Sequence, residues 1–326
     1  MMWRDYALTI GLPQTNHSNF AEAKLLMEAC NFFWWRLGEA IQRPIAQLRT
    51  ASGEPVYATI TFIDETFPPD RTLPTFRLDD RLTFLVGIRA IKNLAVEGLV
   101  VFDREDQLPS TPDHDSWWDR VPPHPVIRFG SIFATPGKDN QLRLAAPMNA
   151  VFQDLPPLPP DDSPLQLARR AQETGRLGVV PDAWSPLDRH GPTEVTYAID
   201  PDRDTNAAGL VYFAHYAAMM ELGERRAIPQ PGQFGWRFPS VPLEHRQLLR
   251  RRVAYFGNAG LFDQVAIAVS RFASSDHPGE LGLRYQLTRA SDRKLICLSE
   301  ALMTLAPHSQ PPERPLSKVQ RAGALS

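Results

Sequence analysis

The chain has 326 residues, with 35 lysines and arginines against 37 aspartates and glutamates, so its formal net charge is −2. This length allows two domains of ordinary size. The hydrophobic fraction of 43% and the charged fraction of 22% are typical of a soluble globular protein. A net charge so close to zero gives no reason to expect a nucleic-acid partner.

The two cysteines and the N-terminus indicate the compartment. Cys30 and Cys297 lie in apolar surroundings without a CxxC partner, which favours buried thiols over a disulfide or a zinc site. The N-terminus MMWRDYALTI lacks a basic start followed by a long apolar run, so we expect no signal peptide. No stretch approaches transmembrane length. We therefore expect a cytoplasmic protein that does not bind membranes.

The first half of the chain is expected to hold one helix and several strands. Residues 4–10 alternate enough for a short strand, and GLPQTNHSN follows as a turn. The run FAEAKLLMEACNFFWWRLGEAI predicts a helix that ends near Pro44, because its residues favour helices and large apolar side chains recur. Strand-like runs then cover residues 55–67, 80–93, 96–104 and 126–134.

Two segments between the predicted elements have the composition of irregular structure. Residues 105–125 are expected to form a loop. Its His114, Asp115 and Asp119 are interpreted as solvated side chains rather than metal ligands, since no repeated ligand spacing supports a site. Residues 147–192 are rich in proline and are interpreted as a surface connector, with a helical turn at LQLARRAQETG.

The second half repeats the order of the first. A leading strand is expected at residues 193–200 and a helix at 207–227; further strands are expected at 248–259, 261–273, 279–290 and 294–306. Residues 307–326 are expected to be disordered. Each half is thus a short strand, a helix and about four strands, which indicates an internal structural repeat. We predict two modules, residues 1–146 and 193–306, joined by the connector at 147–192.

The stretch from Asp200 to Glu224, DPDRDTNAAGLVYFAHYAAMMELGE, is the most informative part of the sequence. Its apolar residues follow helical spacing, and the acidic and polar residues before them are candidate N-caps. Gly209 can let another group approach the backbone closely. The start of such a helix presents free N–H groups to a carbonyl or an oxyanion. On its own, this pattern also fits a buried amphipathic helix with no other role.

TNAAGLVYFAHYAAMMELGERR resembles the central-helix segment of hot-dog acyl-thioester enzymes, whose thioesterase members read roughly TD-A-G-G-V-V-Y-H-A-N-Y-…-M-E. The resemblance implies a long helix wrapped by an antiparallel sheet, and a ligand that is a thioester of coenzyme A or of an acyl carrier protein. Together with the repeat, it implies an α+β double hot-dog fold with two central helices and one continuous sheet. The thioesterase pattern has a carboxylate where this chain has Asn206, which argues against plain hydrolysis.

A narrower resemblance joins several segments. SGEPVYA, the paired helices, DTNAAGLVYFAHY and YFGNAGL are together similar to the double-hot-dog acyltransferase/decarboxylase family of leinamycin biosynthesis. This implies decarboxylation of malonyl- or methylmalonyl-coenzyme A and transfer of the acyl group to an acyl carrier protein, in polyketide-type biosynthesis. Coenzyme A would enter only as part of the substrate, with no other cofactor and no metal. The resemblance leaves the oligomeric state, including a homodimer, open.

In that family a tyrosine in a matching SG-x-P-x-Y segment is essential, and the resemblance gives its role to Tyr57. We expect this position to lie beside the central helices. Tyr57 would be an acyl acceptor or a hydroxyl donor. A phenol with an unperturbed pKa near ~10 is a poor nucleophile, which favours the donor.

Other candidate residues stand at helix starts and turns. Asn206 can donate from its amide to the thioester oxygen or cap the helix. His17 and Ser18 lie in the corresponding turn of the first half and are substrate-binding candidates, as is Gly209. Asn258, in FGNA, shapes a turn or lines the acyl pocket.

Arg250, Arg251 and Arg252 can contact the phosphates of coenzyme A or an acidic carrier protein. Strand alternation puts Arg251 opposite the other two, so the three cannot form one patch. Arg251 is the substrate-binding candidate of the three, with an ordinary charged face as the alternative.

Three further functions stay open. One is a thioesterase, although the Asn206 amide cannot act as a general base. Another is a double-hot-dog dehydratase, although His17 lacks the H-x-x-x-G-x-x-x-x-P motif of that family. The last is a non-catalytic module that binds acyl carrier proteins.

Overall fold

The computed structural model describes residues 3–16, 19–91, 94–108, 114–118, 120, 122–137, 142–150, 152, 155–157, 163–188, 190–206, 209–227 and 246–305. The helices are α1 (Glu22–Ala40), α2 (Pro164–Thr174), α3 (Pro201–Asp204) and α4 (His215–Ala227), with short 3-10 turns at Leu12–Gln14, Ile45–Gln47, Leu73–Thr75 and His114–Trp118. The strands of the first half are β1 (Trp3–Thr9), β2 (Thr15–Asn16), β3 (Asn19–Phe20), β4 (Tyr57–Thr66), β5 (Arg81–Ile91), β6 (Ala95–Arg104), β7 (Val126–Pro136) and β8 (Leu142–Leu144). The later strands are β9 (Ser185–Pro186), β10 (Thr193–Ala198), β11 (Arg246–Tyr255), β12 (Gln264–Ala273), β13 (Glu280–Arg289) and β14 (Leu295–Leu305).

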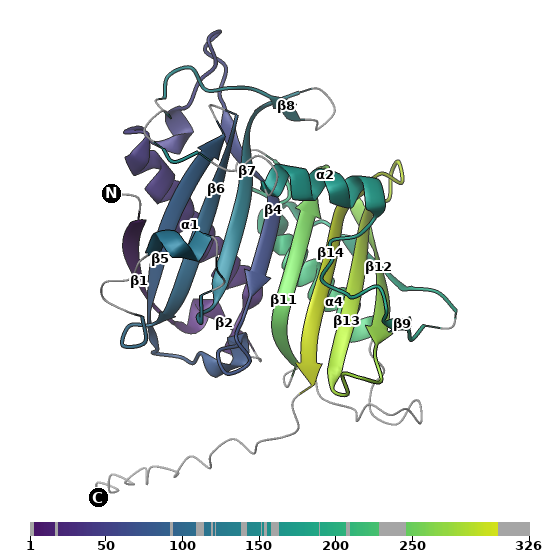
Figure 1. The fold of residues 1–326 in the computed structure, drawn as a ribbon. Helices are drawn as coiled ribbons and strands as arrows, with labels where there is room; N and C mark the ends of the chain where they lie inside the picture. Colours follow the sequence, from purple (N-terminus) through teal and green to yellow (C-terminus); the bar gives the residue numbers. More distant parts are fainter. Residues whose placement is uncertain are drawn as a thin grey trace, which may run out of the picture.

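One antiparallel sheet runs through both halves of the chain (Figure 1). Its strand order is β1-β5-β6-β7-β4-β11-β14-β13-β12-β10, with β8 and β9 added at β7 and β12. The two halves meet where β4 pairs with β11, from Phe62↔Ala254 to Thr66↔Arg250. We call this pairing the seam. The strand runs expected from the sequence agree with the observed long strands to within a few residues, and the short strands β2, β3, β8 and β9 were not expected.

The two long helices lie on the same face of the sheet (Figure 1), the inner face. Helix α1 packs against β5 and β6, and α4 packs against β10 and β12. Apolar residues at helical spacing, Leu25, Leu26, Ala29, Phe33 and Leu37, bury the inward side of α1. In α4, a Cβ on Gly223 would come within 2.8 Å of Val269, so this glycine allows close contact with β12.

Helix α4 starts later than the sequence predicts. It begins at His215 rather than near residue 207, because residues 201–204 form the separate short helix α3. Pro201 and the capping side chain of Asp200 start α3. A tight turn then joins Thr205 and Val211 in a β-bridge. The prediction that Asn206 could cap the central helix is therefore wrong.

Helix α2 covers the outer face of the sheet across the seam (Figure 1). Its Ala168 and Ala171 pack with Leu177 against outer-face residues of β4, β11 and β14, namely Phe62, Ala254 and Leu298. A Cβ on Gly130 would lie 2.2 Å from Pro164, so α2 starts in direct contact with β7. The helical turn predicted in the connector is thus a helix that joins both halves.

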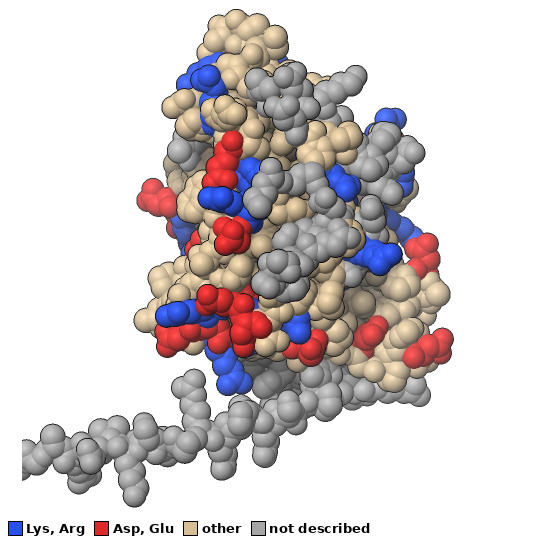
Figure 2. All heavy atoms as spheres, turned by 60° about the vertical axis from the view of Figure 1, so that its left-hand side comes forward, with Lys and Arg blue, Asp and Glu red and all other residues tan. Residues whose placement is uncertain are grey.

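Charged side chains of both signs are intermingled on the face shown in Figure 2. This agrees with the net charge of −2. No helix in the described part of the chain is long and apolar enough to span a membrane. Cys30 and Cys297 are both buried and free, as expected.

Candidate functional site

The central helices run in opposite directions, which gives the molecule two distinct ends. Glu22 at the start of α1 and Glu224 near the end of α4 both contact Arg251. At the opposite end, the ring of Trp34 in α1 lies 6.3 Å from that of Phe213, just before α4. We call these the α1 end and the α4 end, after the helix that starts there.

Four of the sequence candidates belong to segments at the α4 end: Tyr57, Asn206, Gly209 and Asn258. Strand β4 begins there with Tyr57, and β11 ends there, three residues before Asn258. The side chain of Asn258 accepts a hydrogen bond from Val211 N (3.1 Å) and donates to Val211 O (3.4 Å). These bonds attach the turn that carries Asn206 and Gly209 to the loop after β11. The turn-shaping role expected for Asn258 is therefore present.

The turn at Asn206 is tightly hydrogen-bonded. Asn206 N donates to Leu210 O (2.9 Å), and Gly209 N donates to Asn206 O (2.9 Å). Asn206 Oδ1 accepts from Leu210 N at 3.3 Å. This bond orients the side-chain amide, whose donor group is Nδ2. Gly209 has a φ of 70°, and no atom lies within 4 Å of where its Cβ would be, so the turn requires glycine for its backbone angle.

A buried aspartate that the sequence analysis missed holds this turn. The Asp204 carboxylate accepts hydrogen bonds from Tyr197 Oη (2.8 Å), Asp200 N (2.8 Å), Arg203 Nε (2.9 Å) and His215 Nδ1 (3.2 Å). Burial raises the pKa of this carboxyl, but the donated hydrogen bonds lower it by more, so Asp204 stays ionised. The network fixes α3 against the first residue of α4. In sequence, Asp204 is one of several acids before the helix, and nothing distinguishes it.

Tyr57 does not face the central helices. Its neighbours Val56 and Ala58 both pack against the main core on the inner face. Alternation along β4 therefore directs the Tyr57 side chain to the outer face, where it is 40% exposed. Its cross-strand partner is Ala134 of β7. The expectation that this position lies beside the helices is corrected, because a strand residue's face depends on register that the sequence did not fix.

Two other tyrosines lie on the inner face at this end, Tyr216 buried and Tyr255 partly buried. Tyr216 of α4 and Tyr255 of β11 make an edge-to-face contact, with ring centroids 5.2 Å apart. Tyr255 Oη donates to the carbonyl of Phe213 at 3.0 Å. Burial raises the pKa of both phenols, so both are neutral near pH 7. They stabilise the segment that leads into α4.

Arg251 lies inside the protein and is not a surface residue for coenzyme A phosphates. Its side chain is 1% exposed, and its Nε lies 2.8 Å from Glu22 Oε1, with NH2 3.2 Å from Glu224 Oε1. It also lies over the ring of Tyr285, 5.3 Å from the centroid. The substrate-binding hypothesis for Arg251 is therefore wrong, because the guanidinium is buried and already paired with carboxylates inside the protein.

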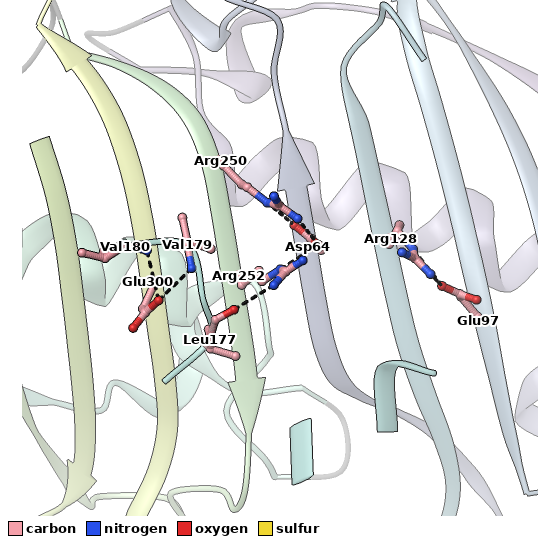
Figure 3. A network of polar contacts seen from close by, with 9 residues as sticks. All are labelled: Asp64, Glu97, Arg128, Leu177, Val179, Val180, Arg250, Arg252 and Glu300. Atoms are coloured by element: carbon pink, nitrogen blue, oxygen red, sulfur yellow. Dashed lines mark hydrogen bonds and ion pairs between the residues drawn. The ribbon is translucent and has the colours of Figure 1, made fainter. Parts of the chain in front are cut away.

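Alternation of the three arginines across the seam is confirmed. Arg250 and Arg252 point to the outer face, where both bind Asp64 of β4 (Figure 3). Arg252 NH1 also donates to Leu177 O of the connector at 2.8 Å. The arginine run therefore joins the two halves on both faces of the sheet.

More carboxyl groups than cations surround Arg251. Glu65, its cross-strand partner in the seam, is fully buried, and neither of its carboxyl oxygens has a hydrogen-bond donor among the described groups. Burial raises the pKa of Glu65 well above its usual range, and Glu22 raises it further. Both effects favour the neutral, protonated form of Glu65. Burial, with Glu22 and Glu224, also raises the pKa of Glu221 to about 7.

The remaining candidates lie outside the described residues. His17 and Ser18 are not described, and neither are Asp119 and the side chains of His114 and Asp115. Among the residues that are described, no group of His, Cys, Asp and Glu side chains could hold a metal ion.

The comparisons with known proteins give one kind of likeness. No protein-family model matches the sequence, and no curated protein matches it. Among solved structures, the chain is similar to an acyl-ACP thioesterase from Bacteroides thetaiotaomicron, with a TM-score of 0.56 and 10% identity over 92% of this chain and 97% of that one. The fold is a double hot dog.

Two more structures support this assignment. A putative oleoyl thioesterase from Lactobacillus plantarum has a TM-score of 0.59 and 12% identity, over 94% of this chain and 96% of that one. The 12:0-ACP thioesterase from Umbellularia californica has a TM-score of 0.55 and 8% identity, over 93% and 94%. The expected α+β double hot-dog fold is thus confirmed. At such low identity the likeness concerns the fold.

Proposed function

We propose that this double hot dog is an enzyme that acts on acyl thioesters of coenzyme A or of an acyl carrier protein. The support is the similarity of nearly the whole chain to three thioesterase structures whose names include acyl-ACP and oleoyl substrates. The rigid turn before α4 adds to this, since a backbone turn at a helix start is suited to a thioester carbonyl.

We further propose that the reaction is decarboxylation of a malonyl- or methylmalonyl-type thioester, followed by acyl transfer to a carrier protein. When carbon dioxide leaves, the electrons of the broken carbon–carbon bond pass into the thioester carbonyl and form an enolate. A proton then adds to the α-carbon, and the carrier thiol displaces the coenzyme A thiol. A preorganised donor at the enolate oxygen stabilises the first step.

The observation that carries this proposal is Asn206. Its Oδ1 accepts from Leu210 N, and its Nδ2 is the group that would donate to a thioester oxygen. A donor stabilises a developing enolate oxygen, whereas the carboxylate of the thioesterase pattern would repel it. Asp204, the nearest carboxylate in the sequence, accepts several hydrogen bonds and has a lowered pKa, which makes it a weak base.

The role of Tyr57 is part of the proposal through the family resemblance. Because Tyr57 is 40% exposed at the α4 end, a thioester arriving from solvent can reach it. We expect Tyr57→Phe to lose most turnover at an unchanged melting temperature, since one hydroxyl is removed and the ring stays. Near-normal turnover would remove Tyr57 from the site.

Hydrolysis is the second candidate, favoured by the thioesterase names of the similar structures. The two reactions separate when carbon dioxide and free thiol are measured together during incubation with malonyl- and methylmalonyl-coenzyme A. We expect carbon dioxide release. Free thiol without carbon dioxide would favour a thioesterase, and binding without either product would favour a non-catalytic module.

A further inference from the structure

The loop between β11 and β12 presents two large apolar side chains to solvent at the α4 end. Leu261 is 48% exposed, and Phe262 is 81% exposed. Phe262 has a φ of 66°, in the left-handed region that is costly for a bulky side chain. A strained backbone that holds an aromatic ring in water does not stabilise the fold, and such strain is found at binding sites.

The backbone of this loop is well fixed. Gly260 N donates to Asp263 Oδ2 at 2.7 Å, and Asp263 N donates back to Gly260 O at 3.2 Å. Asp263 O accepts from Ile199 N at 3.1 Å, which attaches the loop to the end of β10. A defined turn therefore holds Leu261 and Phe262 at the surface. Because the turn is already ordered, binding a partner would cost little conformational entropy.

Two cations lie on the neighbouring hairpin. Arg293 and Lys294, in the turn between β13 and β14, are exposed and form no ion pair within the described part of the chain. The hairpin is joined to the loop by Arg289 NH1, which donates to Asn258 O at 3.0 Å, and by Ala290 N, which donates to Gln264 O at 2.8 Å. We call Leu261, Phe262, Arg293 and Lys294 the docking tip.

We propose that the docking tip binds the acidic carrier protein whose phosphopantetheine thiol accepts the acyl group. This rests on the proposed function. Leu261 and Phe262 would enter an apolar depression of the partner, and Arg293 and Lys294 would contact its acidic side chains. A protruding tip fits a macromolecular partner better than a small ligand, which needs a concave site.

The docking tip lies close to the turn that carries Asn206. The same loop holds Asn258, whose side chain makes both hydrogen bonds to Val211 on the Asn206 turn. A carrier protein bound at the tip therefore sits beside the turn that would hold the thioester. The α1 end has no part in this arrangement, because its interior is filled by Arg251 and its carboxyl partners.

The decisive variant is Phe262→Gly. Glycine accepts a φ of 66° without strain, so the melting temperature should stay the same or rise. Loss of an aromatic anchor typically weakens a complex by about 30-fold or more. We expect that loss for a holo acyl carrier protein measured by surface plasmon resonance. Arg293→Glu with Lys294→Glu should weaken binding as well and remove most of its salt dependence.

A matched control and a second substrate make the test specific. Leu12→Ser removes another exposed apolar side chain, 76% exposed, close to the start of α1, and should leave binding unchanged. With methylmalonyl-coenzyme A as the only substrate, Phe262→Gly should release carbon dioxide at the normal rate, while its KM for the holo carrier protein in acyl transfer rises.

Carrier binding that survives in both tip variants overturns the proposal. So does an equal loss of carbon dioxide release and of acyl transfer to the carrier, which would place the tip in the reaction site, or binding of the tip to anionic vesicles in place of the carrier. If the wild-type protein turns over no thioester, the proposed function fails, and the binding measurements still decide the docking tip.

Discussion

Replacing Arg251 by methionine tests whether this arginine stabilises the interior of the protein or binds phosphate at its surface. The guanidinium is 1% exposed and holds Glu22 and Glu224 at 2.8 and 3.2 Å. Methionine keeps much of the side-chain volume but removes the charge. Both carboxylates then remain buried without their cation. The two halves also lose the ion pair between Arg251 and Glu22 on the inner face of the seam.

The magnitude follows from the burial of these groups. Removing one partner of a buried ion pair costs about 3–5 kcal/mol, because the other charge is left uncompensated. At about 2–4 °C per kcal/mol, the melting temperature should fall by roughly 10 °C. The loss should be smaller at pH 5 than at pH 8, since burial raises the pKa of Glu22 and its protonation removes a stranded charge as the pH falls.

The assay is chemical and thermal unfolding of Arg251→Met beside Arg250→Met. Arg250 is the neighbouring residue on the outer face, with a side chain 38% exposed, and its partner Asp64 keeps Arg252 after the substitution. We expect the control to lose about 0–1 kcal/mol. Equal stability of the two variants, with a raised KM for coenzyme A thioesters in Arg251→Met alone, would refute the buried cluster and restore Arg251 as a phosphate ligand.

Three other predictions concern single carboxyl or amide groups. The folded-state pKa of Glu221 is raised to about 7, so its contribution to stability is present below its unfolded pKa and is lost as the pH rises through 7; Glu221→Gln should flatten this dependence in melting curves taken from pH 5 to 8. Asn206→Asp should cut carbon dioxide release by about 10²–10³-fold at an unchanged melting temperature, and unchanged release would leave Asn206 a turn residue only. Asp204→Asn should destabilise the protein by about 2 kcal/mol in urea unfolding, as expected for lost charge-assisted hydrogen bonds. Because the Asp204 pKa is lowered, its contribution is present above its unfolded pKa and disappears as the pH falls below it; an unaltered midpoint in Asp204→Asn would show that the network contributes nothing.

Periodic burial made much of the fold predictable from the sequence. Helix α1 was expected because Leu25, Ala29 and Phe33 recur at helical spacing, and the main strands were expected from alternation. The start of α4 was not predicted, since Leu210, Phe213 and Ala214 continue the apolar helical spacing although the helix begins only at His215. Hydrogen bonds to Asp204 and Asn258 hold a turn there instead.

The site was less predictable because it depends on which strands pair and in which register. Alternation correctly separated Arg251 from Arg250 and Arg252, yet it could not tell which face was buried. Glu65 was missed for the same reason, since a carboxyl group inside the protein becomes recognisable only once Glu22 and Arg251 are seen beside it. The division into modules 1–146 and 193–306 stays a prediction, which separate expression of the two segments would test.

The central claim is a decarboxylating acyl transfer, and the mass of the carrier protein tests it most directly. A holo acyl carrier protein is incubated with methylmalonyl-coenzyme A, with and without the enzyme, and its intact mass is measured. We expect a propionyl group on the phosphopantetheine arm, formed together with carbon dioxide and only when the enzyme is present. The proposal is contradicted if the carrier protein stays unloaded while the enzyme hydrolyses the thioester to free coenzyme A and methylmalonate.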